Sequence, residues 1–84
     1  MPTHALKTVP PYFKDIVEGT KTFEIRKNDR LFKVGDRLLL QEYLPKEEKY
    51  TGQEWEGEIT YILDNPDYCK KGFVTMGIKQ RENY

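Results

Sequence analysis

The sequence predicts an α+β domain in which about five strands form a small antiparallel barrel with one short helix beside it. Three observations support this fold class. The chain has 84 residues, a length that suits one domain with one hydrophobic core. Several segments alternate apolar and polar residues with the period of two that is typical of strands, and a single short segment has helical spacing. We therefore treat residues 1–84 as one domain.

The first strand is predicted at residues 4–9 and the helix at residues 11–18. The strand segment HALKTV ends at two consecutive prolines, where a helix can begin. Gly19 suits the left-handed position just past the end of a helix. The apolar residues of the helical segment recur at helical spacing and are Tyr12, Phe13, Ile16 and Val17.

A second strand with an unusually polar face is predicted from Lys21 onward, ending at a turn over residues 28–30. Its apolar residues alternate with polar ones, so one side carries Phe23 and Ile25 and the other carries Thr22, Glu24, Arg26 and Asn28. Strict alternation places Lys21 on the opposite side from Glu24 and Arg26. These three side chains converge only if the chain near residues 19–21 bends out of the strand.

The third strand is predicted at residues 37–43, after a turn at residues 34–36. Its sequence RLLLQEY contains an almost continuous apolar stretch, so we expect it to be central in the sheet. Residues 44–53 contain proline, glycine and several charges, which indicates a surface loop.

The last two strands are predicted at residues 55–63 and 73–78. In the fourth strand Trp55, Gly57, Ile59, Tyr61 and Leu63 alternate with polar residues, which predicts one solvated face. Residues 64–72 form another predicted loop, and a polar tail follows the fifth strand. We expect the sheet to curl into a barrel because closure removes exposed strand edges.

Composition excludes several classes of function. Fourteen basic and fourteen acidic residues give a formal charge of zero, which argues against a uniformly basic face for nucleic acid. The chain has no serine, so a serine triad is excluded, and Cys69 and His4 lie far apart in sequence. No spacing of histidine, cysteine or acidic residues suggests a metal site, and no glycine-rich loop suggests a cofactor. A lone cysteine, no leader and no long apolar run favour a cytoplasmic protein.

The most probable working surface is the charged segment GTKTFEIRKNDR, at residues 19–30. A lysine and an arginine near a helix end can hold a phosphate or a base edge, and a neighbouring carboxylate can orient the guanidinium. A solvated strand face with weak surface ion pairs is the alternative interpretation.

The segment resembles the signature of the ASCH domains, the activating-signal-cointegrator homology group of the PUA-like superfamily. The signature G-x-K-x-x-E-x-R is matched by Gly19, Lys21, Glu24 and Arg26. Further matches cover most of the chain and resemble a small, mostly uncharacterised ASCH-like family of bacteria and their phages. They are His4, Leu6 and Lys7, the run EIRKNDR at residues 24–30, Gly35 with Asp36, QEY at residues 41–43, and YTG at residues 50–52.

The resemblance implies a PUA-like barrel with a helix beside a cleft that binds RNA or a nucleotide, without cofactor or metal. Lys21 and Arg26 would then face phosphate or a base edge, Glu24 would accept hydrogen bonds from Arg26 or a base amine, and Gly19 would let the backbone approach the ligand. The implied ligand-binding set also includes the extension of the signature and an aromatic residue for stacking: Lys27, Asn28, Arg30 and Tyr50, with Tyr43 as a further candidate.

Two other functions stay open. Some ASCH relatives resemble amidohydrolases that deacylate a modified cytidine with a threonine, a lysine and a glutamate, so Lys21, Glu24 and Thr22 (or Thr20) are the catalytic candidates here. However, this chain has Glu24 where those enzymes have the threonine, and it lacks their helical insertion before the last strand. The third possibility is a protein-interaction module, because the fourth strand carries an exposed row of acidic residues: Glu54, Glu56 and Glu58.

Overall fold

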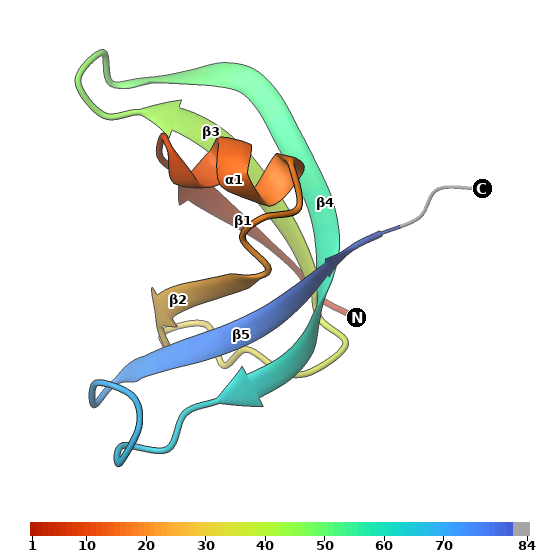
Figure 1. The fold of residues 1–84 in the computed structure, drawn as a ribbon, viewed down its shortest axis with the longest axis vertical. Coiled ribbons are helices and arrows are strands. Elements are labelled where there is room, and N and C mark those ends of the chain that lie inside the picture. The colour runs from red at the N-terminus through yellow and green to blue at the C-terminus, as the bar shows by residue number, and fades with distance from the viewer. Residues whose placement is uncertain (82–84) are drawn as a thin grey trace.

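The protein folds as one curled, five-stranded sheet with a single short helix, as a computed structural model that describes residues 1–81 shows (Figure 1). This confirms the prediction of five strands and one helix. None of the described helices combines the length and the apolarity needed to cross a bilayer. The elements in chain order are β1 (Thr3–Thr8), α1 (Tyr12–Val17), β2 (Phe23–Lys27), β3 (Arg37–Leu44), β4 (Lys49–Leu63) and β5 (Phe73–Gln80).

The sheet is mixed, and the prediction of a wholly antiparallel barrel was wrong. The strand order is β1-β3-β4-β5-β2, and β1 pairs with β3 in parallel. A parallel pair needs a crossover connection, which α1 and β2 supply before the chain returns to β3. The sheet is therefore a half-barrel whose two edges are β1 and β2 (Figure 1), and among residues 1–81 no backbone ladder joins those edges.

Strand β3 lies inside the sheet and is paired on both sides, as predicted, and β4 is the middle strand of the five. The predicted loop at residues 44–53 was wrong, because β3 and β4 continue as a hairpin that leaves a turn only at residues 45–48. Tyr43 and Tyr50 face each other across this hairpin with ring centroids 5.1 Å apart in an edge-to-face arrangement. Such cross-strand aromatic pairs stabilise a sheet enough to extend it through a polar sequence.

The alternation predicted along β4 holds only as far as Ile59. A bulge follows, in which Ile59 pairs with Ile78 and Tyr61 pairs with Gly77, so that β4 has one extra residue at this point. The extra residue reverses the side to which later residues point. Tyr61 is consequently 67% exposed, whereas sequence alternation placed it on the same side as the buried Trp55.

One hydrophobic core fills the concave side of the sheet. Helix α1 contributes Phe13 and Ile16, and its other two apolar residues, Tyr12 and Val17, are half exposed. The remaining core residues come from the strands and from the connection between β2 and β3: Leu6, Phe32, Leu38, Leu40, Trp55, Ile59, Val74, Met76 and Ile78. Strand β5 extends to Gln80, beyond its predicted end, and the last three residues of the predicted polar tail lie outside the described residues.

A largely buried hydrogen bond between side chains holds the start of β1 to the turn before β3. Nε2 of His4 lies 2.9 Å from Oδ2 of Asp36, which also accepts a hydrogen bond from the backbone amide of Lys33. The imidazole ring packs edge-on against Phe32. Burial of the carboxyl group acts to raise the pKa of Asp36, but the hydrogen bonds from His4 and Lys33 and their positive charges outweigh burial, so the pKa is lowered.

Replacement of this carboxylate tests its contribution. We expect Asp36→Asn to lower the free energy of unfolding at neutral pH by about 1–3 kcal/mol, because a buried charged hydrogen bond is lost. Because folding lowers the pKa of Asp36, its carboxylate stabilises the fold at pH values above the ordinary pKa of 3.8. This stabilisation is lost as the pH falls through the lower pKa of the folded protein. The difference between wild type and variant, measured by urea unfolding, should therefore shrink in acid. Asp29→Asn, at an exposed aspartate, is the control; an equal loss there would contradict this account.

Candidate functional site

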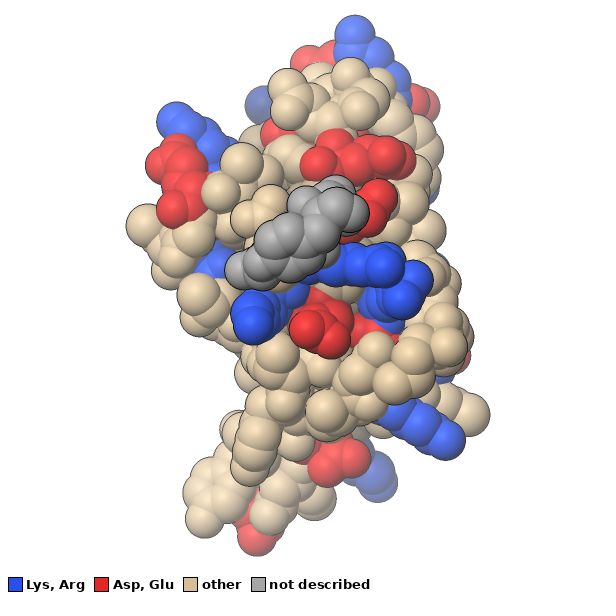
Figure 2. All heavy atoms as spheres, turned by 90° about the vertical axis from the view of Figure 1, so that its right-hand side faces the viewer, with Lys and Arg blue, Asp and Glu red and all other residues tan. Residues whose placement is uncertain are grey.

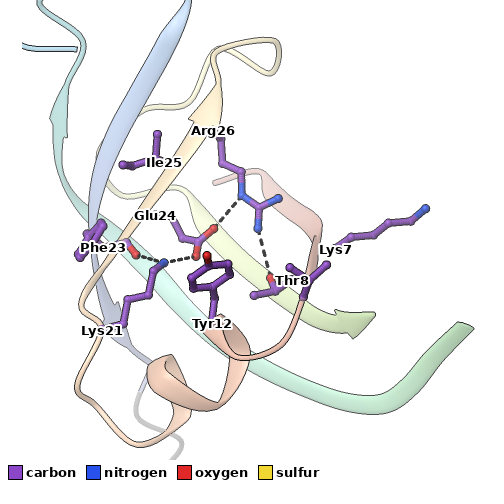
Figure 3. Close-up of a pocket in the computed structure, with 9 residues that line it drawn as sticks. Lys7, Thr8, Tyr12, Lys21, Phe23, Glu24, Ile25 and Arg26 are labelled. Carbon is purple, nitrogen blue, oxygen red and sulfur yellow. Dashed lines mark hydrogen bonds and ion pairs between the residues drawn. The ribbon is translucent and has the colours of Figure 1, made fainter. Parts of the chain in front are cut away.

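A cleft of about 500 Å³ lies between the two edges of the half-barrel, beside α1 (Figure 3). One wall is the end of β1 and the start of α1, and the other wall is β2 with the residues just before it. The lining residues are Lys7, Thr8, Val9, Tyr12, Lys21, Phe23, Glu24, Ile25 and Arg26. The cleft therefore occupies the place where a closed barrel would have a strand-to-strand ladder.

Glu24 is the centre of this cleft and is held by two cations. Nζ of Lys21 donates to Oε1 of Glu24 at 2.9 Å, and Nε of Arg26 donates to Oε2 at 2.7 Å. The carboxylate side chain is only 4% exposed, whereas the Lys21 and Arg26 side chains are 18% and 25% exposed. The buried negative charge is thus paired on both oxygens, and both positive groups reach the surface of the cleft.

Lys21 reaches Glu24 because the chain bends out of the strand, as strict alternation requires. Gly19 has a φ of +83°, which ends α1 in the left-handed region, and the backbone amides of Thr20 and Lys21 both donate to the carbonyl of Asp15. Strand β2 begins only at Phe23. The sequence motif thus combines a helix end with a strand, which brings Lys21, Glu24 and Arg26 together.

Strand β2 has its polar residues on the concave side of the sheet. Figure 3 shows Glu24 and Arg26 pointing into the cleft and Phe23 and Ile25 pointing to the other side of the strand. Nη2 of Arg26 donates to Oγ1 of Thr8 at 3.2 Å, which joins β2 to β1 across the open seam. A second bridge, between Nη1 of Arg30 and the carbonyl of Ala5, spans the same seam.

Five residues of the predicted ligand-binding set do not line the cleft. Gly19 and Arg30 shape or brace it as described, and Lys27 points away from it at the end of β2. The Asn28 amide donates to the carbonyl of Gly72 in the loop before β5. Tyr50 packs on Tyr43 at the far end of the long hairpin.

Sequence reasoning missed the wall of the cleft formed by β1 and α1. Its residues come from a different part of the chain than the motif, and they include Tyr12, which is half exposed, and Lys7, whose ammonium lies 4.3 Å from the centroid of the Tyr43 ring. One signal was present in the sequence. Thr8 is a hydroxyl residue on the same side of β1 as the buried Leu6, and a polar residue at a core-facing position needs a partner.

Comparison with known proteins places the chain in a family. A family described as a domain of unknown function, DUF3850, matches residues 3–78. The chain belongs to the DUF3850 family. It is also similar to an uncharacterised 12.9 kDa protein in the GpA 3′ region of Escherichia phage P2, with 37% identity over 67 residues. That match covers 80% of this chain and 60% of the phage protein, so the DUF3850 chain spans well under the full length of its relative.

The catalytic candidates of this DUF3850 domain are only partly brought together. Lys21 and Glu24 meet in the cleft, but Thr22 is exposed and its carbonyl accepts from the Ile78 amide. The hydroxyl of Thr20 donates to the carbonyl of Asp15. Neither threonine lines the cleft. Residues 1–81 also contain no group of three histidine, cysteine or acidic residues that could hold a metal ion.

The acidic residues of β4 lie on the outer face of the sheet among basic residues. Glu58 pairs with Arg37 on one side and with Lys79 on the other, and the Glu54 carboxylate accepts a hydrogen bond from Gln41. Figure 2 shows acidic and basic atoms side by side on this face. The row is therefore part of a surface of mixed charge and not an isolated acidic stripe.

Substitution of Glu24 tests how strongly the DUF3850 fold depends on this carboxylate. We expect Glu24→Gln to lower the free energy of unfolding by about 1–3 kcal/mol, because two cations lose their buried counter-charge while the side-chain volume is kept. Glu18→Gln is the matched control, since Glu18 makes only an exposed 3.6 Å pair with Lys14. Its effect in the same urea titration should stay within about 0.5 kcal/mol. Equal effects of the two substitutions would show that the pairing at Glu24 contributes no more than a surface ion pair.

Proposed function

We propose that this DUF3850 chain is an ASCH-like, PUA-like domain that binds a nucleotide, free or within RNA, in the cleft between β1 and β2. The observation that carries the proposal is the pair of cations, Lys21 and Arg26, fixed at the cleft surface by the buried carboxylate of Glu24. The half-barrel with a helix beside its cleft and the G-x-K-x-x-E-x-R signature support the assignment.

The charges of the cleft favour an anionic ligand. Two cations and one carboxylate leave an excess of one positive charge around Glu24. Arg26 uses Nε for Glu24 and Nη2 for Thr8, so its guanidinium plane is fixed before any ligand arrives. A fixed guanidinium loses little conformational entropy when it binds a phosphate group, and phosphate suits its geometry.

The cleft also offers an aromatic surface for a base. Tyr12 is half exposed at the start of α1, and its ring centroid lies 5.8 Å from Nζ of Lys21. A planar ring beside a cation suits a nucleobase next to its phosphate. A volume of about 500 Å³ falls within the usual range of small-molecule sites, which is roughly 300–1,000 Å³.

Titration with nucleotides tests the proposal. We expect nucleoside 5′-monophosphates to bind more tightly than their nucleosides, and binding to weaken as salt is added, because phosphate contacts supply much of the affinity. Arg26→Ala should weaken monophosphate binding by about tenfold or more, because a charged hydrogen bond is lost. Tyr12→Ala removes the aromatic surface without touching Glu24, so it tests the cleft separately from stability. Isothermal titration calorimetry gives each dissociation constant.

The control is Lys46→Ala, which removes an exposed cation in the hairpin turn far from the cleft. Its affinity should equal that of wild type. Equal weak binding by wild type, Arg26→Ala and Tyr12→Ala would show that the nucleotide does not bind in this cleft. An acylated cytidine belongs among the probes, because its deacylation in a Lys21-dependent manner would replace a binding role with a catalytic one.

A further inference from the structure

The convex side of the sheet carries an apolar surface formed by three neighbouring strands, β2, β5 and β4. Residues that pair directly across strands point to the same side, so the sheet register gives the composition of this surface. We call it the outer platform. It consists of three rows of paired residues: Phe23, Gly77 and Tyr61; Ile25, Thr75 and Leu63; and Lys27 with Phe73.

The first row of the outer platform has an exposed aromatic residue on either side of a glycine. Phe23 is 43% exposed and Tyr61 is 67% exposed, and Gly77 between them has no side chain. Neighbouring strands lie about 4.8 Å apart, so the two aromatic residues start about 10 Å from each other. A Cβ atom on Gly77 would meet Oγ1 of Thr60 at 3.1 Å, so side chains of the neighbouring strand β4 lie close to this glycine. The ammonium of Lys21, 4.8 Å from the Phe23 ring centroid, braces one of the two rings.

The charges on the outer platform have one sign. The three rows contain Lys27 and no acidic residue. Lys79 follows Gly77 on the same side of β5, and Nζ of Lys70 lies 5.2 Å from the centroid of the Phe73 ring. The mixed charges around Glu58 adjoin the platform at the Lys79 end.

We propose that the outer platform binds single-stranded nucleic acid, with bases stacked on the exposed rings of Phe23 and Tyr61 and the backbone along the lysines. Proteins hold single-stranded nucleic acid with exposed aromatic residues, on which the bases stack, and with cations that contact its backbone. A second copy of this chain fits less well, because Lys27 of each copy would face the three rows of the other copy, which contain no acidic residue.

The outer platform meets the cleft along one edge. Phe23 and Ile25 point away from Glu24 and Arg26 on the same strand (Figure 3) but still border the cleft, whereas Tyr61 does not line it. The inference does not rest on the proposed nucleotide site. Strand β2 would present one ligand on each of its sides.

Binding of labelled oligonucleotides tests the outer platform. Fluorescence anisotropy would follow single-stranded oligouridylate and oligodeoxythymidylate of about ten nucleotides, a typical length for one small domain. We expect wild type to bind, and Tyr61→Ala to weaken binding by about 5-fold to 150-fold, the usual effect of losing one stacked base. Phe23→Leu, which keeps an apolar side chain beside Lys21, should weaken binding in the same direction. Tyr68→Ala, at an exposed tyrosine in the loop between β4 and β5, should bind as wild type does.

Titration of the same variants with a nucleoside monophosphate separates the two proposals. Monophosphate binding that depends on Arg26, with oligonucleotide binding unaffected by Tyr61→Ala, would overturn the outer platform and leave the cleft assignment standing. Oligonucleotide binding that depends on Tyr61, without monophosphate binding, would support the outer platform and overturn the cleft assignment. The outer-platform proposal would also be overturned if wild type bound no oligonucleotide. Self-association in sedimentation that Tyr61→Ala abolishes would overturn it in favour of a contact between copies.

Discussion

The open seam of the half-barrel depends on one buried carboxylate. Strands β1 and β2 are the two edges of the sheet, and no backbone ladder joins them within residues 1–81. Side chains join the two edges instead. Glu24 holds Lys21 and Arg26, and Arg26 donates a hydrogen bond to Thr8 on the opposite edge. Because these groups stand in for backbone hydrogen bonds, the seam keeps a cleft of about 500 Å³ that a closed ladder would fill. The candidate site therefore lies where the sheet has no backbone ladder.

Much of the fold was predictable from local patterns in the sequence. Alternation located β2 and β4, and runs of strand-forming or apolar residues located the other three strands. The glycine after the helix marked the bend that brings Lys21 to Glu24. The failures came from interactions between distant residues. The parallel pairing of β1 with β3 joins residues about 34 positions apart, and the hairpin extension depends on Tyr43 meeting Tyr50. The bulge after Ile59 adds one residue to β4, which no composition rule marks.

The candidate site was predictable only on the side that the motif occupies. Lys21, Glu24 and Arg26 lie within six residues, so spacing alone could group them. Tyr12 and Thr8 belong to the opposite wall, and only the strand order shows that β1 faces β2. Strand alternation assigned the residues of β2 to its two sides correctly, but it did not show which side faces inward. Here the polar side does, and the pairing of both Glu24 oxygens offsets part of the cost of burying this charge.

The strand order also has a consequence for how the protein folds. Strands β3, β4 and β5 follow one another as antiparallel neighbours, so their contacts close short loops, whereas β1 and β2 attach to strands that come much later in the chain. Short loops close at lower entropic cost, so we expect the central meander to form first and the two edges to dock last. Every residue that lines the cleft lies between Lys7 and Arg26, in β1, α1, β2 or the segments that join them. The cleft is thus completed only when the chain is fully folded, and a ligand that fills it would hold the two late-docking edges together.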